Sequence, residues 1–390
     1  MILHDPGFKV THHDYGIMLP ISPSRADRIV EALAPPPGFM LDMAAAVRAL
    51  NLPAGPVLAR QDLERVHSKN YVAALYGDGP GGKQSLLDAL LAAWELIDER
   101  GRPNRYEPDR AARPLEELFG KILTQAGGTY LACRLALARR AGTAAESAGF
   151  CYYLGGGMHH ARYGSGTGFC LINDIMIAAR KLHAEKRAEL IWVVDVDAHK
   201  GCGTAELIRL ARERGELSTD GVDLRITNDG SGQCFHAGSP QIFSLSIHMA
   251  RGWPLDAETL AKARPGHAPL VPADVEIPVD SGGEKCYISA LEAGLRKLRQ
   301  LSESYAQHRS SGKWKPDLVI VVDGADPYEH DGLASSSPIK LSLAQCLDRD
   351  RLVYDHLRRE NIPSAWILAG GYGERAWEPV AAFLAECILA

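Results

Sequence analysis

Residues 190–199 decide the fold, and they read Leu-Ile-Trp-Val-Val-Asp-Val-Asp-Ala-His. The continuous apolar run that opens the stretch predicts a strand buried on both faces, as in a parallel sheet covered by helices. Asp195, Asp197 and His199 follow at once and alternate with apolar residues. If the strand continued through them, all three side chains would lie on one side. The stretch therefore predicts a polar site at the carboxyl end of a buried strand.

The same pattern recurs along the chain. Apolar runs predict strands at residues 150–154, 242–247, 318–322 and 365–368. Apolar residues at helical spacing predict helices at residues 134–141, 175–186, 288–299 and 347–360. This alternation predicts an α/β fold with a single open, mostly parallel sheet and helices on both faces. No repeat or long linker divides the chain, so we expect one domain over residues 1–390.

Polar clusters follow four of the five predicted strands. They occupy residues 155–160, 195–199, 323–326 and 370–373. Ligands of open parallel sheets bind at the carboxyl ends of the strands, so we expect the four clusters to form one site there.

Composition narrows the class of protein. The chain has 390 residues, of which 46% are hydrophobic and 23% charged, which excludes a disordered or fibrous protein. A net charge of −5 and a pI of about 6.3 argue against a nucleic-acid or anionic-membrane partner. The eight cysteines contain no Cys-x-x-Cys pair, and no secretory leader or membrane-spanning run is visible. We therefore expect a cytoplasmic protein with reduced thiols.

Two aspartates and one histidine have the chemistry of a catalytic metal site. Asp197 and His199 can bind one cation, and Asp326 from another strand end can supply a third ligand. Three protein ligands with an open position are typical of catalytic zinc. A single aspartate at a strand end is more often a helix cap or a solvated turn, but the combination favours a metal.

Two further features indicate hydrolysis. The adjacent His159 and His160 would be ordinary loop residues if isolated, but beside a metal they fit an acid–base couple. Tyr372, set among glycines, can donate a hydrogen bond to a developing oxyanion. Together the residues predict metal-assisted hydrolysis of a polarised carbonyl.

With these motifs in order, the chain resembles the zinc-dependent histone deacetylase and acetylpolyamine amidohydrolase family, which has the arginase-deacetylase fold. The carrying segments lie at residues 66–71, 156–161, 168–174, 195–199, 324–326 and 370–372. The resemblance runs from about residue 60 to about residue 375. Residues 1–60 and 77–114 match less clearly, and we expect an N-terminal extension and rim loops there.

The resemblance implies a role for each matching residue. It implies that Asp197, His199 and Asp326 bind one catalytic Zn²⁺. It implies that His160 is the general base and then the general acid, that His159 is its electrostatic partner oriented by Asp195, and that Tyr372 stabilises the oxyanion. The implied substrate tunnel consists of Gly168, Phe169, Trp253, Leu333, Gly370 and Gly371, although a buried Trp253 fits a core position equally well. A structural monovalent cation such as K⁺ would be bound by Asp195, Asp197, His199, Ser246 and Ile247.

One departure from the family pattern concerns the catalytic histidine. After His199 the family continues with His or Gln, Gly, and then Asp or Asn, whereas this chain has Lys200, Gly201 and Cys202. Without a carboxylate partner the pKa of His160 should fall, and the acidic limb of the pH–rate profile should fall with it. Cys202 is either a buried structural cysteine or a redox-sensitive thiol.

The predicted function is removal of an acetyl or other acyl group from a lysine side chain or a related acylated amine. Acetylpolyamine hydrolysis is an alternative, because residues 77–114 carry charges of both signs. An arginase-like two-manganese enzyme is disfavoured, since its last bridging Asp would fall at Gly201. A non-catalytic acyl-lysine binding protein is an alternative of another class. A homo-oligomer is compatible with all of these functions.

Overall fold

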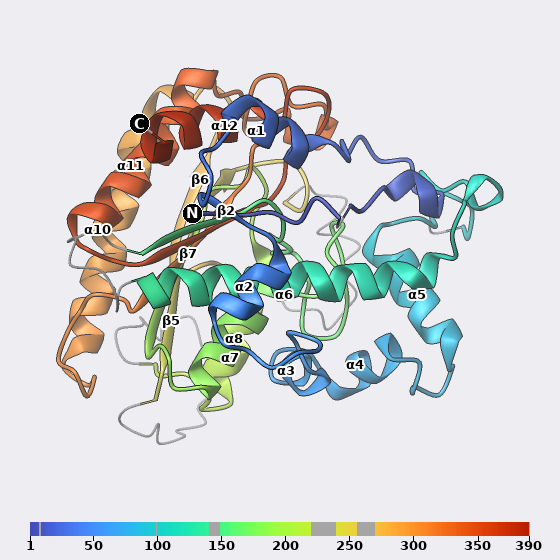
Figure 1. Cartoon of the computed structure of the whole chain (residues 1–390), viewed down its shortest axis with the longest axis horizontal. Coiled ribbons are helices and arrows are strands. Elements are labelled where there is room, and N and C mark those ends of the chain that lie inside the picture. The colour runs from blue at the N-terminus through green and yellow to red at the C-terminus, as the bar shows by residue number, and fades with distance from the viewer. Residues whose placement is uncertain (8, 99, 140–148, 220–238, 256–269, 390) are drawn as a thin grey trace.

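A computed structural model shows one eight-stranded, fully parallel sheet with helices on both faces (Figure 1). The structure describes residues 1–7, 9–98, 100–139, 149–219, 239–255 and 270–389. The strand order is β2-β1-β3-β8-β7-β4-β5-β6. The strands are β1 Ile2–Leu3, β2 Met40–Leu41, β3 Phe150–Tyr153, β4 Leu190–Asp195, β5 Gln241–Met249, β6 Val275–Val279, β7 Leu318–Asp323 and β8 Ser364–Leu368.

Strand residues alternate between two apolar layers, as the period of two requires. In β4, Ile191 and Val193 pack into one layer, whereas Trp192 and Val194 pack into the other. Helices α6 (Leu118–Arg139), α7 (Asp174–Ala184) and α8 (Cys202–Glu213) cover the first face. The second face is covered by α1 (Arg25–Leu33), α10 (Tyr287–Ala306), α11 (Leu343–Arg359) and α12 (Glu378–Leu384).

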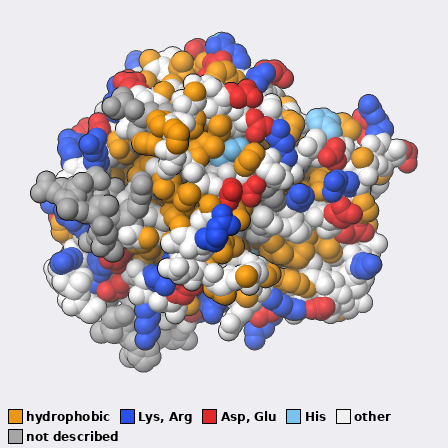
Figure 2. Space-filling view, in the orientation of Figure 1, with side chains coloured by type: hydrophobic (Ala, Val, Ile, Leu, Met, Phe, Trp, Pro, Cys, Tyr) orange, Lys and Arg blue, Asp and Glu red, His pale blue; other side chains and the backbone are white. Residues whose placement is uncertain are grey.

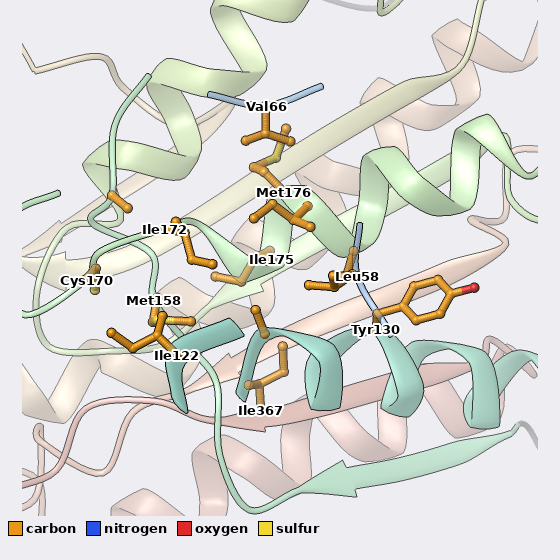
Figure 3. Close-up of a cluster of buried hydrophobic side chains, with 14 of the residues drawn as sticks. Leu58, Val66, Ile122, Tyr130, Met158, Cys170, Ile172, Ile175, Met176 and Ile367 are labelled. Carbon is orange, nitrogen blue, oxygen red and sulfur yellow. The ribbon is translucent and has the colours of Figure 1, made fainter. Parts of the chain in front are cut away.

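The remaining helices build up the side of the molecule next to α6. They are α2 (Met43–Ala49), α3 (Arg60–Glu64), α4 (Lys69–Leu75) and α5 (Lys83–Ala93). Ile122 and Tyr130 of α6 and Ile175 and Met176 of α7 belong to one cluster of buried side chains (Figure 3). Figure 2 shows apolar side chains gathered at the centre of the face turned to the viewer, with charged side chains around them. Among the described residues, no helix has the length and apolarity that crossing a membrane requires.

The predicted α/β fold is confirmed, and the sheet order explains why four polar clusters meet. Strands β3, β8, β7 and β4 are consecutive neighbours, so the loops that follow them lie side by side at one edge. Each predicted strand matches an observed one within a few residues. The predicted helices at 175–186, 288–299 and 347–360 correspond to α7, α10 and α11, and residues 140–141 of the fourth lie outside the described part.

The structure corrects two expectations. Strand β4 ends at Asp195, so it does not continue through Asp197 and His199, which lie on a loop of bends. Residues 77–114 are not only rim loops, because they contain α5, whose last residue, Ala93, accepts a hydrogen bond from the Phe169 amide at 2.9 Å.

Candidate active site

The loop after β4 carries two candidate metal ligands, Asp197 and His199. Hydrogen bonds between carboxylate side chains and backbone amides of this loop fix their positions. Asp195 Oδ1 accepts from the Asp197 amide at 3.1 Å, and Asp197 Oδ1 accepts from the His199 amide at 2.9 Å. These short-range bonds turn both side chains toward the loop after β7, where Asp326 Oδ1 accepts from the Ala198 amide at 2.9 Å. The three predicted ligands, Asp197, His199 and Asp326, therefore converge, with one ligand atom of each within 4.8 Å of the others.

The charges of this triad fit a bound cation. All three side chains are buried, and His199 Nδ1 lies 2.8 Å from Asp326 Oδ2. Burial raises the pKa of Asp326 to about 7, and the negative charge of Asp197 contributes to this. Burial would lower the pKa of His199, but its bonds to Asp197 and Asp326 raise that pKa to about 10. A positive charge is thus already favoured between the carboxylates, and a dication bound by this donor set would supply it.

The backbone at Gly370 passes close to the carboxylate oxygen atoms of Asp197 and Asp326. A Cβ at Gly370 would lie 2.5 Å from Asp197 Oδ2 and 2.6 Å from Asp326 Oδ2. Only glycine therefore allows the chain to pass this close to both carboxylates, while its amide donates to Asp197 Oδ2 at 2.9 Å.

The two adjacent histidines point their Nε2 atoms toward each other at 2.9 Å. His159 Nδ1 lies 2.7 Å from Asp195 Oδ2, and the orienting role of Asp195 stays a prediction. Burial would lower the pKa of His159, but Asp195 and Asp197 raise it to about 9. Burial, together with the charges of His159 and His199, lowers the pKa of His160 well below its usual range. These opposite shifts favour the positive charge on His159 and a neutral His160 ring.

Among the described residues, the partners of the other ring nitrogen of His160 are neutral groups. Its Nδ1 lies 3.7 Å from the Cys202 sulfur, and the Lys200 carbonyl is its backbone partner. Burial raises the pKa of Cys202 to about 11, so this thiol is uncharged at neutral pH. A neutral acceptor favours the His160 proton on Nδ1 and leaves the Nε2 lone pair facing His159 Nε2, without the pKa increase that a carboxylate would cause.

A cavity of about 220 Å³ lies beside the histidine pair, and Tyr372 is one of the residues that line it. Burial and the charges of Asp326 and Asp197 raise the pKa of Tyr372 well above its ordinary value, so its hydroxyl keeps its proton. The Tyr372 amide donates to Asp331 Oδ2 at 2.7 Å. Arg25 in α1 donates to the carbonyls of Ala369, Gly370 and Gly371 at 2.6–2.9 Å. The loop that carries the phenol is thus held from both sides.

The predicted tunnel residues divide into two groups. Gly168, Phe169, Gly370 and Gly371 line the cavity together with Asp197, His199 and the histidine pair. Phe169 has a φ of 65°, a strained conformation for a bulky residue that places its ring 6.2 Å from the Tyr372 ring. Trp253 and Leu333 do not line the cavity.

Trp253 instead packs against His160 and His199, and its indole lies so close to Gly168 that a Cβ there would be 2.3 Å away. Its half-buried indole lies edge-on to His160, with ring centroids 4.6 Å apart, and 5.8 Å from the His199 ring. Leu333 lies in the loop after β7, and its amide donates to Asp331 Oδ1 at 2.9 Å. The segment that follows Trp253, residues 256–269, lies outside the described part of the chain.

The structure places the residues of the predicted monovalent-cation site at the ends of neighbouring strands. Ser246 in β5 pairs in register with Asp195 in β4. The Ser246 hydroxyl lies 3.0 Å from His248 Nδ1, and the Ile247 side chain belongs to the core. This cation site stays a prediction.

The position that would distinguish an arginase-like site is closed. A Cβ at Gly201 would lie 2.3 Å from Asp195 Oδ2, so no bridging carboxylate fits there in this arrangement. Within the described ranges, Asp197, His199 and Asp326 are the single group of three side chains close enough to share a metal ion.

Several supporting residues were not predicted. Asp174 accepts from the amides of Gly157 and Met158 at 3.0 and 2.7 Å, and it fixes the turn that carries the histidine pair. Ser335 Oγ lies 3.2 Å from His199 Nε2. Asp174 lies in segment 168–174, which carries the family resemblance, and that motif was the signal available in the sequence. No sequence pattern marks Ser335 or Arg25 as part of the site, because their contacts form only when the chain folds.

A parallel α/β sheet with an Asp–His–Asp triad at its carboxyl edge defines the arginase-deacetylase class of folds. Residues 19–387 match the family model described as the histone deacetylase domain. The chain belongs to this family.

Relatives and a solved structure agree with this assignment. The chain is 27% identical over 255 residues to an uncharacterized protein of Picosynechococcus, covering 65% of this chain and 63% of that one. It is 25% identical over 311 residues to histone deacetylase 2 of Arabidopsis thaliana, covering 80% and 60%. The chain thus spans less than two thirds of the length of these curated relatives. The fold resembles an acetylpolyamine aminohydrolase of Burkholderia pseudomallei, with a TM-score of 0.54, 19% identity and coverage of 98% and 97%.

We predict that the Asp326→Asn variant binds zinc at least about 100-fold more weakly than the wild type, because a ligand charge is lost. Competition with a chromophoric chelator, together with elemental analysis, measures this affinity. Asp280→Asn removes an exposed carboxylate and serves as the matched control. Equal zinc affinity in Asp326→Asn and wild type would show that the triad is not the metal site.

Proposed function

We propose that this chain is a zinc-dependent deacylase whose residues 1–390 form a single catalytic domain. Its substrate is an acetylated or otherwise acylated lysine side chain or related amine. The observation that supports this most directly is the position of the buried Asp–His–Asp triad beside the convergent Nε2 atoms of His159 and His160. Family membership supports the same chemistry.

Zinc bound by Asp197, His199 and Asp326 would supply the Lewis acidity that polarises an amide carbonyl and acidifies water. The side chains of the protein handle the protons. His160 Nε2 accepts a proton from the attacking water, since burial and its neighbours keep this ring neutral. The same nitrogen then returns the proton to the departing amine.

Two neighbours stabilise the charges that develop. The Tyr372 hydroxyl, which keeps its proton, donates a hydrogen bond to the carbonyl oxygen as that oxygen becomes negative. His159 carries a positive charge that Asp195 balances at 2.7 Å, and this pair fixes the orientation of the His159 ring toward His160. The cavity walls exclude water from the reacting amide.

The surface beside the tunnel wall supports an acyl-lysine substrate over a polyamine. The Arg105 guanidinium is exposed and lies 5.9 Å from the centroid of the Phe169 ring. No carboxylate in the described ranges forms an ion pair with Arg105. A cation at this position repels the free ammonium groups of an acetylpolyamine, whereas a peptide with neutral or acidic neighbours is tolerated.

The first test is hydrolysis of an acetyl-lysine peptide and of acetylated polyamines by the zinc-loaded protein. We expect turnover that disappears on chelation and returns with zinc. In Tyr372→Phe we expect kcat to fall about 10²–10³-fold at unchanged zinc content, because the oxyanion loses a donor. Bound zinc and acyl-lysine affinity without any turnover would instead establish the non-catalytic binding protein.

The pH dependence tests the neutral environment of His160. Replacing Cys202 by Asp should raise the pKa of His160, so the acidic limb of kcat/KM should move about 1 unit to higher pH. Cys202→Ser, which stays neutral, should leave the limb where the wild type has it. Superimposable profiles for the Asp and wild-type proteins would contradict this account.

Substrate choice tests the role of Arg105. In Arg105→Glu we expect the ratio of kcat/KM for acetylspermidine to that for an acetyl-lysine peptide to rise about five- to tenfold at low salt, and less at high salt. Arg110→Glu, an exposed change in the same segment, is the control. An unchanged ratio in Arg105→Glu would remove this argument for acyl-lysine.

A further inference from the structure

Helix α11 carries Arg349, whose side chain is buried in the interior behind the metal triad. Arg349, Asp350 and the partner Asp323 at the end of β7 are all fully buried. The neighbouring residues on this face of α11, such as Cys346 and Val353, belong to the apolar core. A guanidinium removed from water at such a place costs free energy unless it is fully hydrogen-bonded.

The bonds of Arg349 connect two loops rather than one. Its Nη1 donates to the Gly324 carbonyl at 2.7 Å and to the Val196 carbonyl at 3.1 Å. Val196 directly precedes Asp197, and Gly324 lies two residues before Asp326. One nitrogen atom therefore bridges the loops after β4 and β7 that carry the two carboxylates of the triad.

The rest of the guanidinium is anchored by carboxylates. Nη2 donates to Asp323 Oδ1 and Nε to Asp350 Oδ1, both at 2.6 Å. Asp323 also accepts the Tyr152 hydroxyl from β3 at 2.7 Å. Asp323 thus ties Arg349 to β7 and, through Tyr152, to β3 on the other side of β8, which limits the movement of Arg349 relative to the sheet edge.

Stability alone is a weak reason for this cluster. Replacing buried ion pairs by apolar side chains of similar size is often neutral or stabilising, so such pairs contribute more to position than to stability. What an apolar replacement could not do here is hold the Val196 and Gly324 carbonyls at one donor. The spacing of the two loops is the property that depends on Arg349.

We propose that Arg349 is a positioning residue that fixes the distance between the Asp197 and Asp326 loops and so sets the affinity and geometry of the metal site. It touches neither the metal ligands' side chains nor the cavity, and it acts through the backbone. The inference rests on the proposed zinc site, because it assigns a second layer of support to that site.

The chain supplies a matched control. Arg212 in α8 is another buried arginine, bonded to Asp274 at 2.6 Å and to the Ile242 carbonyl at 2.6 Å. Its partners among the described residues are Gln241, Asp274 and Ile242, which all lie outside the loops of the triad. Arg349→Met and Arg212→Met therefore remove the same group from two buried networks, and only one of them supports the metal ligands.

The experiment measures zinc affinity by chelator competition and the visible spectrum of the Co²⁺-loaded protein, with urea unfolding to confirm that each variant is folded. We expect Arg349→Met to bind zinc about 10- to 100-fold more weakly and to show an altered Co²⁺ spectrum. Arg212→Met should keep both wild-type values even where its unfolding midpoint falls. Arg349→Lys keeps the charge and stays measurable if the Met variant does not fold, and we expect a smaller loss of affinity in the same direction.

The outcomes are distinguishable. Wild-type zinc affinity and spectrum in a folded Arg349 variant would overturn this inference and leave the proposed function intact. Equal losses in the Arg349 and Arg212 variants would also overturn it, since the effect would then be general destabilisation. A wild-type chain that binds no zinc would overturn the proposed function together with this inference.

Discussion

The structure depends on one electrostatic constraint, which is the burial of two carboxylates and an imidazole at the carboxyl edge of the sheet. Asp197, Asp326 and His199 are 2%, 0% and 4% exposed, so water cannot screen the two like charges. The carboxylates accept hydrogen bonds from neighbouring amides, and burial, together with the charge of Asp197, raises the pKa of Asp326. A bound cation would balance the negative charge of the two carboxylates in this site.

Much of the surrounding fold serves to keep that charge cluster in place. The four strands whose loops meet there are consecutive in the sheet, and an apolar layer on each face of the sheet excludes water. Arg25 and Asp331 hold the Tyr372 loop, Asp174 holds the turn of the histidine pair, and Arg349 spans the two carboxylate loops. Reactive side chains thus come from loops, while rigid elements behind the loops set their positions.

The sequence predicted the central strands and the triad because both depend on local patterns. Continuous apolar runs such as β4 and β7 have no other stable place than a covered parallel sheet, and the polar residues follow them directly. Strands β1 and β2 have two residues each, too few for any periodicity, and they form by pairing with neighbours that are distant in sequence. Arg25 reaches carbonyls some 345 residues away, a contact that exists only after folding. Arg349 is marked in the sequence only by the charged pair that it forms with Asp350 on the otherwise apolar face of α11. Its acceptors in the two loops are backbone atoms, which no sequence motif reveals.

X-ray absorption at the zinc edge tests the central claim most directly. With zinc on Asp197, His199 and Asp326, the first shell contains only nitrogen and oxygen, at about 2.0–2.2 Å. Two thiols lie near the site, Cys170 in the cavity wall and Cys202 beside His160. The measurement therefore distinguishes the proposed ligands from a cysteine sulfur. A sulfur scatterer at about 2.3 Å would place the metal on a cysteine and contradict the account.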